Sequence, residues 1–355
     1  MVINVNTLLK ITKNFPNTKV WNDSCSCAEL KYSIENGATG ATTNPVIVLN
    51  VLKNELPLWE DKIKEFISNN PTSTEDEIAW NVIGALGTEG SKLLLNQYNS
   101  SKGQEGRISF QTNAKYYRSY DKMLEQGKLL SKLVPNSQIK APTSKAGVKV
   151  FEELTYLGIS INATVSFTTA QAIKVAEAVE RGLKRREEVG LPTDFLSPVC
   201  TLMIGRLDDY LKGYVKENNI NINEEALEFA GVSVFKNTYK LYKERNYRTK
   251  LLIAAFRNDY HVSEFLGGDL ILTIPYKNQL YYNTLNLPME STINNPVKKE
   301  YLEQLLSLTE FKKAYYEEGL KEEEFEHYGA FLITINQFLN GYDDLVRLIR
   351  SFIVK

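Results

Sequence analysis

The sequence has few of the residues that most often build metal sites and nucleophilic triads. It contains two histidines, His261 and His327, and three cysteines, Cys25, Cys27 and Cys200. A Ser-His-Asp mechanism or a histidine-rich metal site therefore has little material, and a Cys-x-Cys pair without further ligands is a poor zinc site. We expect reduced cysteines that pack as small hydrophobes, no metal, and acid–base chemistry carried by carboxylates, lysine or tyrosine.

An excess of charge of one sign and a long apolar run are also missing. The chain has 42 basic and 43 acidic residues, so its net charge gives no reason to expect nucleic acid as a partner. The sequence has no run near the length of about 20 apolar residues that spans a bilayer. The first twenty residues also lack the basic start and apolar core of a signal peptide. We therefore expect a cytoplasmic protein without a membrane partner.

What the sequence does have is eight short apolar or β-branched runs, separated by segments with helical spacing. The runs are residues 18–23, 39–44, 107–112, 137–142, 159–164, 199–204, 250–256 and 269–274. Strands that alternate with helices are typical of repeated βα units around a parallel sheet, and eight such units can close into a barrel. The pattern predicts an α/β fold, the (β/α)₈ or TIM barrel.

The segments between the runs supply the helices. One apolar stripe consists of Leu49, Leu52, Leu56, Trp59, Ile63 and Phe66. Thr74 followed by Glu77 predicts a capping box at a helix start, whereas the segment between the first two strands is too short for a full helix. From Pro288 onward we expect further helices, the last of them long and packed over the barrel. Residues 1–355 would then form a single domain with a helical extension over about 288–355.

The C-terminal ends of the strands form the candidate site, because barrel enzymes carry their active sites there. Hydrophobes and turn formers would suffice at these ends, but most of the residues found are polar and chemically mixed. They are Asp23, Asn44, Gln111, Lys140, Asn162, Thr164, Met203, Arg206, Arg257 and Thr273. The set offers an amine, a carboxylate, carboxamides and two guanidiniums to one end of the predicted barrel.

Lys140 stands between two apolar residues in a run that we expect to be buried. A lysine that loses its hydration has a lowered pKa, and its neutral amine can attack a ketone to form a Schiff base. The alternative is a lysine whose ammonium extends to solvent from the strand end. Asp23 could accept the proton of a substrate hydroxyl while a carbon–carbon bond breaks, or it could be a turn or helix-cap aspartate.

Four further strand-end residues could handle water or substrate hydroxyls. Gln111 and Thr164 both donate and accept hydrogen bonds and could hold a water between them. Asn44 and Asn162 could bind hydroxyl groups, although Asn44 followed by Pro45 is also an ordinary turn signal.

The two arginines follow the sixth and seventh runs, close to where barrels often place phosphate sites. Two planar guanidiniums, Arg206 and Arg257, could converge on a phosphate. The alternative is that each forms an ion pair at the rim of the barrel.

Two stretches resemble signatures of the transaldolase family. GATTNP (40–45) is similar to the family's T-[ST]-N-P motif, and QIKAPTSKAG (138–147) is similar to the strand that carries its Schiff-base lysine. The resemblance continues through residues 158–172, 204–206 and 254–258 and covers most of the chain in order. It implies a (β/α)₈ class I aldolase that binds a sugar phosphate and needs neither metal nor organic cofactor. It also implies a homodimer formed through the C-terminal helices.

The resemblance assigns roles to positions of this chain. The implied catalytic residues are Lys140, Asp23, Thr164 and Gln111. The implied substrate-binding residues are Asn44, Asn162, Thr43, Met203, Arg206 and Arg257. Lys140 would be the nucleophile, Asp23 the acid and base, and Thr164 a ligand of the catalytic water. The family reaction, part of the pentose phosphate pathway, moves a dihydroxyacetone unit from fructose 6-phosphate or sedoheptulose 7-phosphate to an aldose phosphate.

Three positions depart from the family pattern. Gln111 replaces the glutamate of transaldolases and is similar to the glutamine of fructose-6-phosphate aldolases. Met203 stands where transaldolases have phenylalanine and those aldolases have tyrosine, and Ala255 replaces a serine beside the phosphate site. Four hypotheses stay open: a transaldolase, an aldolase that releases free dihydroxyacetone, a family member that acts on a modified sugar, and a barrel that binds sugar phosphate without turnover.

Overall fold

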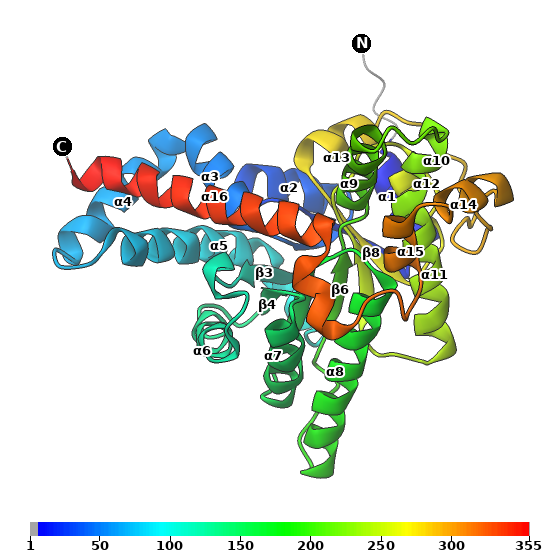
Figure 1. Ribbon diagram of the computed structural model, residues 1–355. Coiled ribbons are helices and arrows are strands. Elements are labelled where there is room, and N and C mark those ends of the chain that lie inside the picture. Colours follow the sequence, from blue (N-terminus) through cyan, green and yellow to red (C-terminus); the bar gives the residue numbers. More distant parts are fainter. Residues whose placement is uncertain (1–5, 355) are drawn as a thin grey trace.

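The computed structural model describes residues 6–354 and contains a closed barrel of eight strands (Figure 1). Each strand pairs in parallel with the next one in the sequence, and β8 pairs with β1. The strands are β1 Thr18–Asn22, β2 Ala38–Ala41, β3 Arg107–Gln111, β4 Ser137–Pro142, β5 Ile161–Ser166, β6 Val199–Leu202, β7 Lys250–Ile253 and β8 Leu270–Ile274. The predicted TIM barrel is confirmed, and every strand overlaps its predicted run.

Helices surround the barrel. The first half of the chain forms α1 Thr7–Asn14, α2 Cys27–Glu35, α3 Pro45–Asn54, α4 Leu56–Asn69, α5 Glu75–Ser100, the 3₁₀ helix η1 Ala114–Tyr116, α6 Tyr120–Leu130, α7 Lys145–Tyr156 and α8 Thr169–Glu188. The second half forms α9 Ile204–Glu217, α10 Glu224–Glu228, α11 Ala230–Glu244, α12 Tyr260–Ser263, α13 Tyr276–Tyr282, α14 Lys299–Leu305, α15 Thr309–Tyr315, the 3₁₀ helix η2 Glu322–His327 and α16 Gly329–Ile353. Within residues 6–354, none of these helices combines the length and hydrophobicity needed to cross a membrane.

Local sequence explains where several of these helices begin and end. The capping box at Thr74 starts α5 as predicted. The expectation of too little room between the first two strands was wrong, because the nine-residue α2 fits there with Ser26 as its N-cap. The stripe from Leu49 to Phe66 is divided between α3 and α4 at Glu55. Pro57 explains the break, since proline has no N–H for the bond that a continuous helix would require.

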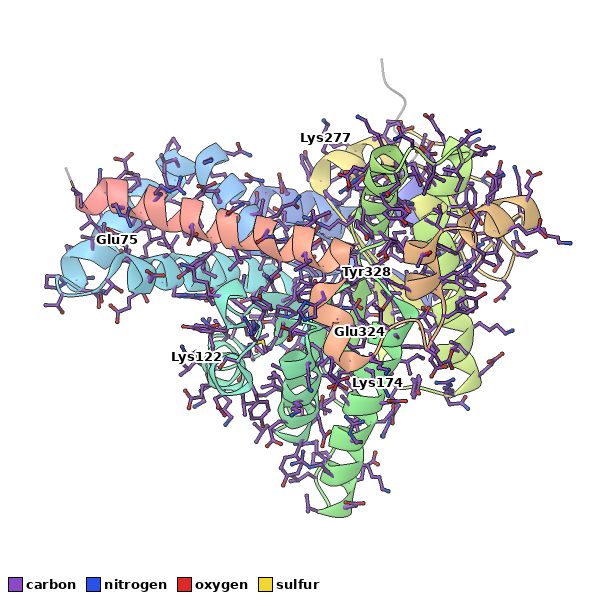
Figure 2. The ribbon with its side chains drawn as sticks, viewed as in Figure 1. Glu75, Lys122, Lys174, Lys277, Glu324 and Tyr328 are labelled. Atoms are coloured by element: carbon purple, nitrogen blue, oxygen red, sulfur yellow. The ribbon has the colours of Figure 1, made fainter. Side chains whose placement is uncertain are left out.

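The predicted long C-terminal helix is confirmed as α16, which leaves the barrel and runs along α3 and α5 (Figure 1). Leu345 and Ile349 of α16 are buried in a second apolar cluster, separate from the barrel core, with residues of α3, α4 and α5. Figure 2 shows Tyr328 at the inner end of this helix and Glu75 towards its outer end, where Arg350 donates to Glu75 at 2.8 Å. The outer part of α16 therefore packs in a core that it shares with α3, α4 and α5.

Two glycines set how closely α7 and α9 approach the barrel mouth. A Cβ at Gly147 would lie 1.9 Å from the carbonyl oxygen of Pro142, and a Cβ at Gly205 would lie 1.8 Å from that of Ala255. Neither position has room for a side chain, so glycine is required at both. The contact at Gly205 presses the first turn of α9 against the segment after β7. Ala255 in that segment has a φ of 67°, in the left-handed region.

Candidate active site

Lys140 is the central residue of the mouth. It lies on β4, its side chain is 4% exposed, and its Nζ donates to the carbonyl oxygen of Thr43 at 3.2 Å, beyond the end of β2. Burial lowers the pKa of Lys140 to about 8, and the charge of Arg206 also lowers it, whereas Asp23 raises it. At pH 7 about a tenth of such an amine is neutral, against less than about one part in a thousand for an exposed lysine. Lys140 therefore provides a nucleophilic amine near neutral pH.

Asp23 directly follows β1 and belongs to the same group of charges. Burial raises the pKa of Asp23, while Lys140, the Thr42 hydroxyl and Arg206 act in the opposite direction. Thr42 Oγ1 donates to Asp23 Oδ1 at 2.7 Å and lies 2.6 Å from Thr273 Oγ1. These hydroxyls fix the orientation of the carboxylate. The sequence analysis missed this contact of Thr42, because the signature TTN does not say which threonine faces the carboxylate.

Gln111 lies beside Lys140 in the β3–β4 register and is 4% exposed. Neither its Oε1 nor its Nε2 has a hydrogen-bond partner among residues 6–354. A buried carboxamide without a partner costs about 1–3 kcal/mol, so this site is suited to a water or a substrate hydroxyl. Thr164 of β5 is fully buried and its hydroxyl contacts Met203 Sδ at 3.8 Å. The geometry offers polar groups that could hold a water, with a thioether nearby.

Both asparagines have protein partners. Asn162 is fully buried, its Oδ1 accepts from Thr201 Oγ1 at 2.7 Å and its Nδ2 donates to Ser109 Oγ at 3.1 Å. Asn44 Oδ1 accepts from the backbone N–H of Ile47 at 3.0 Å and caps α3, which accounts for its place in the N-P turn. Their substrate-binding roles stay predictions.

The two arginines lie close enough for their charges to interact. Burial lowers the pKa of the Arg206 guanidinium, and the charge of Arg257 lowers it further. Arg206 donates from Nη1 to Gln337 of α16, and its guanidinium lies 5.5 Å from the ring centroid of Phe338. Arg257 is exposed and forms an ion pair, with Nε and Nη2 donating to Asp209 Oδ2 at 2.9 and 2.7 Å. The alternative of a rim ion pair therefore holds for Arg257 in this structure.

A buried pair that the sequence analysis did not identify anchors the segment carrying Arg257. His261 Nδ1 accepts from the backbone N–H of Arg257 at 3.1 Å, and His261 Nε2 lies 2.8 Å from Asp208 Oδ2. Because Nδ1 accepts, a neutral His261 carries its proton on Nε2 and donates it to Asp208. Asp208 Oδ1 also accepts from the backbone N–H of Gly231 at 2.7 Å, and burial raises the pKa of Asp208. The pair joins α9, α11 and α12 behind the arginines.

Fold and site together define a class of protein, an α/β barrel whose mouth brings an amine and a carboxylate within electrostatic reach of a guanidinium. The chain belongs to the transaldolase and fructose-6-phosphate aldolase family, since the family described as "Transaldolase/Fructose-6-phosphate aldolase" matches residues 20–327. The family resemblance inferred from the sequence is thus confirmed.

Several curated transaldolases are similar to this chain at low identity. The transaldolase of Thiobacillus denitrificans is 28% identical over 273 residues, which is 70% of this chain and 74% of that protein. A transaldolase of Campylobacter jejuni is 27% identical over 300 residues, covering 79% of this chain and 86% of that protein. Transaldolase 2 of Streptomyces avermitilis is 24% identical over 263 residues, or 72% and 70% of the two chains. The chain is therefore a member of an enzyme family.

Proposed function

We propose that this protein is a transaldolase that moves a dihydroxyacetone unit from a ketose phosphate to an aldose phosphate through a Schiff base on Lys140. The observation that carries the proposal is the buried Lys140 amine, whose pKa is about 8 and which interacts electrostatically with Asp23. Family membership and the names of the relatives support the same chemistry. The cytoplasmic location and the homodimer stay predictions.

The first half of the reaction uses both Lys140 and Asp23. The neutral amine of Lys140 attacks the C2 ketone of fructose 6-phosphate, and loss of water from the adduct gives an iminium ion. The Asp23 carboxylate takes the proton of the C4 hydroxyl, the C3–C4 bond breaks, and its electron pair neutralises the iminium as an enamine. Glyceraldehyde 3-phosphate leaves, and a three-carbon unit stays bound to the lysine.

The second half reverses these steps on another aldose phosphate. The enamine carbon attacks the aldehyde, and protonated Asp23 returns its proton to the new alkoxide. Water then hydrolyses the imine, which releases the new ketose phosphate and the free amine of Lys140. The raised pKa of Asp23 suits a carboxyl group that must hold a proton between two steps.

A second candidate is a lyase that releases free dihydroxyacetone, and Gln111 is the observation that favours it. Its side chain is buried without a partner among residues 6–354, so a water can be held near the lysine without a carboxylate. Release requires that such a water protonate the enamine carbon before an acceptor arrives. The position of Met203 disfavours this route, because a thioether supplies no proton.

Trapping with borohydride tests the proposal. We expect fructose 6-phosphate and borohydride to leave a reduced adduct on Lys140, located by mass spectrometry. The trapping rate should rise with pH, with a midpoint near 8, where half of the amine is neutral. The variant Lys140→Met should lose the adduct, whereas Lys145→Met, which removes an exposed lysine paired with Glu323, should keep it. A wild-type protein that binds the sugar without forming an adduct would be a binding barrel, and the proposal would be wrong.

Product analysis then separates the two catalytic candidates. With fructose 6-phosphate alone, a transaldolase stops after one turnover because the enamine remains bound, whereas a lyase continues and accumulates dihydroxyacetone. Addition of erythrose 4-phosphate should restore turnover of a transaldolase. Continued turnover without any acceptor aldehyde would favour the lyase.

A further inference from the structure

The rim of the mouth contains a carboxylate that already occupies one of the two arginines. Asp209 lies on α9, three residues after Arg206, and its Oδ2 accepts from both Nε and Nη2 of Arg257. Nη1 of Arg257 donates to the carbonyl oxygen of Phe256 at 3.1 Å. A carboxylate or phosphate binds a guanidinium through two adjacent N–H groups. In Arg257 the Nε and Nη2 groups already donate to Asp209, and Nη1 donates to the backbone, so the whole guanidinium has protein partners.

Asp209 also interacts with the second arginine. Its negative charge raises the pKa of Arg206, opposing the effect of Arg257. The two guanidiniums repel each other, and Asp209 offsets that repulsion. A substrate phosphate would provide the same compensation, so Asp209 and the phosphate compete for the same positive charge.

The ion pair between Arg257 and Asp209 is exposed to solvent, so its members can change partners. The side chains of Arg257 and Asp209 are 39% and 51% exposed. Exposed ion pairs contribute little free energy, so an incoming anion can displace the carboxylate. A buried pair of the kind formed by Asp208 and His261 would not exchange in this way.

We propose that Asp209 is a built-in competitor of the substrate's anionic group, and that it sets how strongly this enzyme prefers phosphorylated over unphosphorylated sugars. The inference rests on the proposed function and extends it to the residue that determines specificity. In the structure Asp209 holds Arg257. When a phosphorylated sugar binds, its phosphate takes over the Nε and Nη2 edge of Arg257, and Asp209 turns to solvent.

The first test measures the binding of inorganic phosphate to the full chain. Binding is monitored through the NMR signals of the arginine side chains. We expect Asp209→Asn to bind phosphate about three- to fivefold more tightly than the wild type, as suits the loss of an exposed ion pair. Asp209→Glu should stay close to the wild type, because it keeps the charge. In Asp209→Asn combined with Arg257→Met the gain should vanish.

The second test uses steady-state kinetics. In Asp209→Asn, the ratio of kcat/KM for fructose 6-phosphate to that for fructose should rise by a similar factor. Asp344→Asn is the matched control, because Asp344 is 45% exposed and pairs with Arg347 on the outer part of α16. Its ratio should equal that of the wild type.

The direction of the change in phosphate affinity decides between competition and positioning by Asp209. If Asp209 only positioned Arg257, Asp209→Asn would weaken phosphate binding, and the competition hypothesis would be overturned. Unchanged binding in Asp209→Asn would overturn it as well. Phosphate binding does not depend on turnover, so a missing adduct on Lys140 would refute the proposed function and leave the measured effect of Asp209 interpretable.

Discussion

The Lys140 side of the barrel mouth and the Arg257 side differ in how the protein holds their charged groups. Lys140 is 4% exposed, and the Asp23 carboxylate, whose charge acts on Lys140, is held by the hydroxyl of Thr42. Arg257 is exposed, and its partner Asp209 is an exposed residue of a surface helix. The backbone of Arg257 is nevertheless held firmly, through the buried His261.

The difference suits the role that we propose for each side. Covalent chemistry needs groups whose positions and pKa values are fixed in advance, and burial shifts both pKa values towards the neutral forms. Anion binding needs a charge that a mobile ligand can reach and leave, and a pair near water exchanges partners easily. The prediction is that changes on the Lys140 side alter rates, whereas changes on the Arg257 side alter apparent affinity.

The largest effect is expected for Asp23→Asn. Loss of the base should lower kcat by about a hundredfold or more, since general acid–base groups contribute about 10²–10⁴. The adduct should still form, but mass spectrometry after borohydride should find the whole six-carbon sugar on Lys140 in place of the three-carbon unit. Asp23 raises the pKa of Lys140, so its removal should shift the rise in trapping to lower pH.

The prediction for Asp23→Asn has a matched control and a result that would contradict it. Asp343→Asn, which removes an exposed carboxylate of α16 that pairs with Lys115, should behave as the wild type. Trapping of a three-carbon unit by Asp23→Asn at the wild-type rate would show that another group takes the C4 hydroxyl proton. The division of the mouth into a chemical side and a binding side would then lose its main support.

An intermediate effect is expected for Arg257→Met. Charged hydrogen bonds contribute about 1.5–3 kcal/mol, and the Arg257 guanidinium is exposed, so we expect KM for fructose 6-phosphate to rise about tenfold with a small change in kcat. The effect should shrink in high salt, because exposed charges are screened. Arg347→Met, which removes an exposed arginine on α16, serves as the control. A fall in kcat with constant KM would contradict the comparison.

The smallest effect is expected for Gln111→Glu. A carboxylate would draw the proton of a held water towards itself, so the water would protonate the enamine carbon less readily. We expect release of free dihydroxyacetone to fall about two- to fivefold relative to transfer, measured by product analysis with and without erythrose 4-phosphate. Increased release would mean that the water acts through another group.

Much of the fold could be predicted because its signals are local. Eight strands were found from short apolar runs, and the capping box at Thr74 marked the start of α5. The errors in the predicted helices also came from short segments. Segment length alone suggested too little room for α2, and the apolar stripe that continues across Glu55 concealed the boundary between α3 and α4.

The sequence was enough to propose a set of candidate site residues, but it did not show which of them contact one another. Lys140 and Asp23 were inferred from their place at strand ends, and in the structure they lie close enough for each charge to shift the other group's pKa. Thr42, Asp208 and His261 were missed because their importance depends on which side chains meet across strands and helices distant in sequence. Asp208 and His261 are 53 residues apart in the chain but 2.8 Å apart in space.

The sequence by itself determined the barrel, the family and the chemical groups at the mouth, because strand periodicity and short motifs are written in adjacent residues. Tertiary structure alone decided the protonation tendencies of these groups and their partners. Burial lowers the pKa of Lys140, and packing leaves the Gln111 amide without a partner among residues 6–354. Folding also pairs Asp209 with Arg257. Desolvation and long-range contacts exist only once the chain has closed around them.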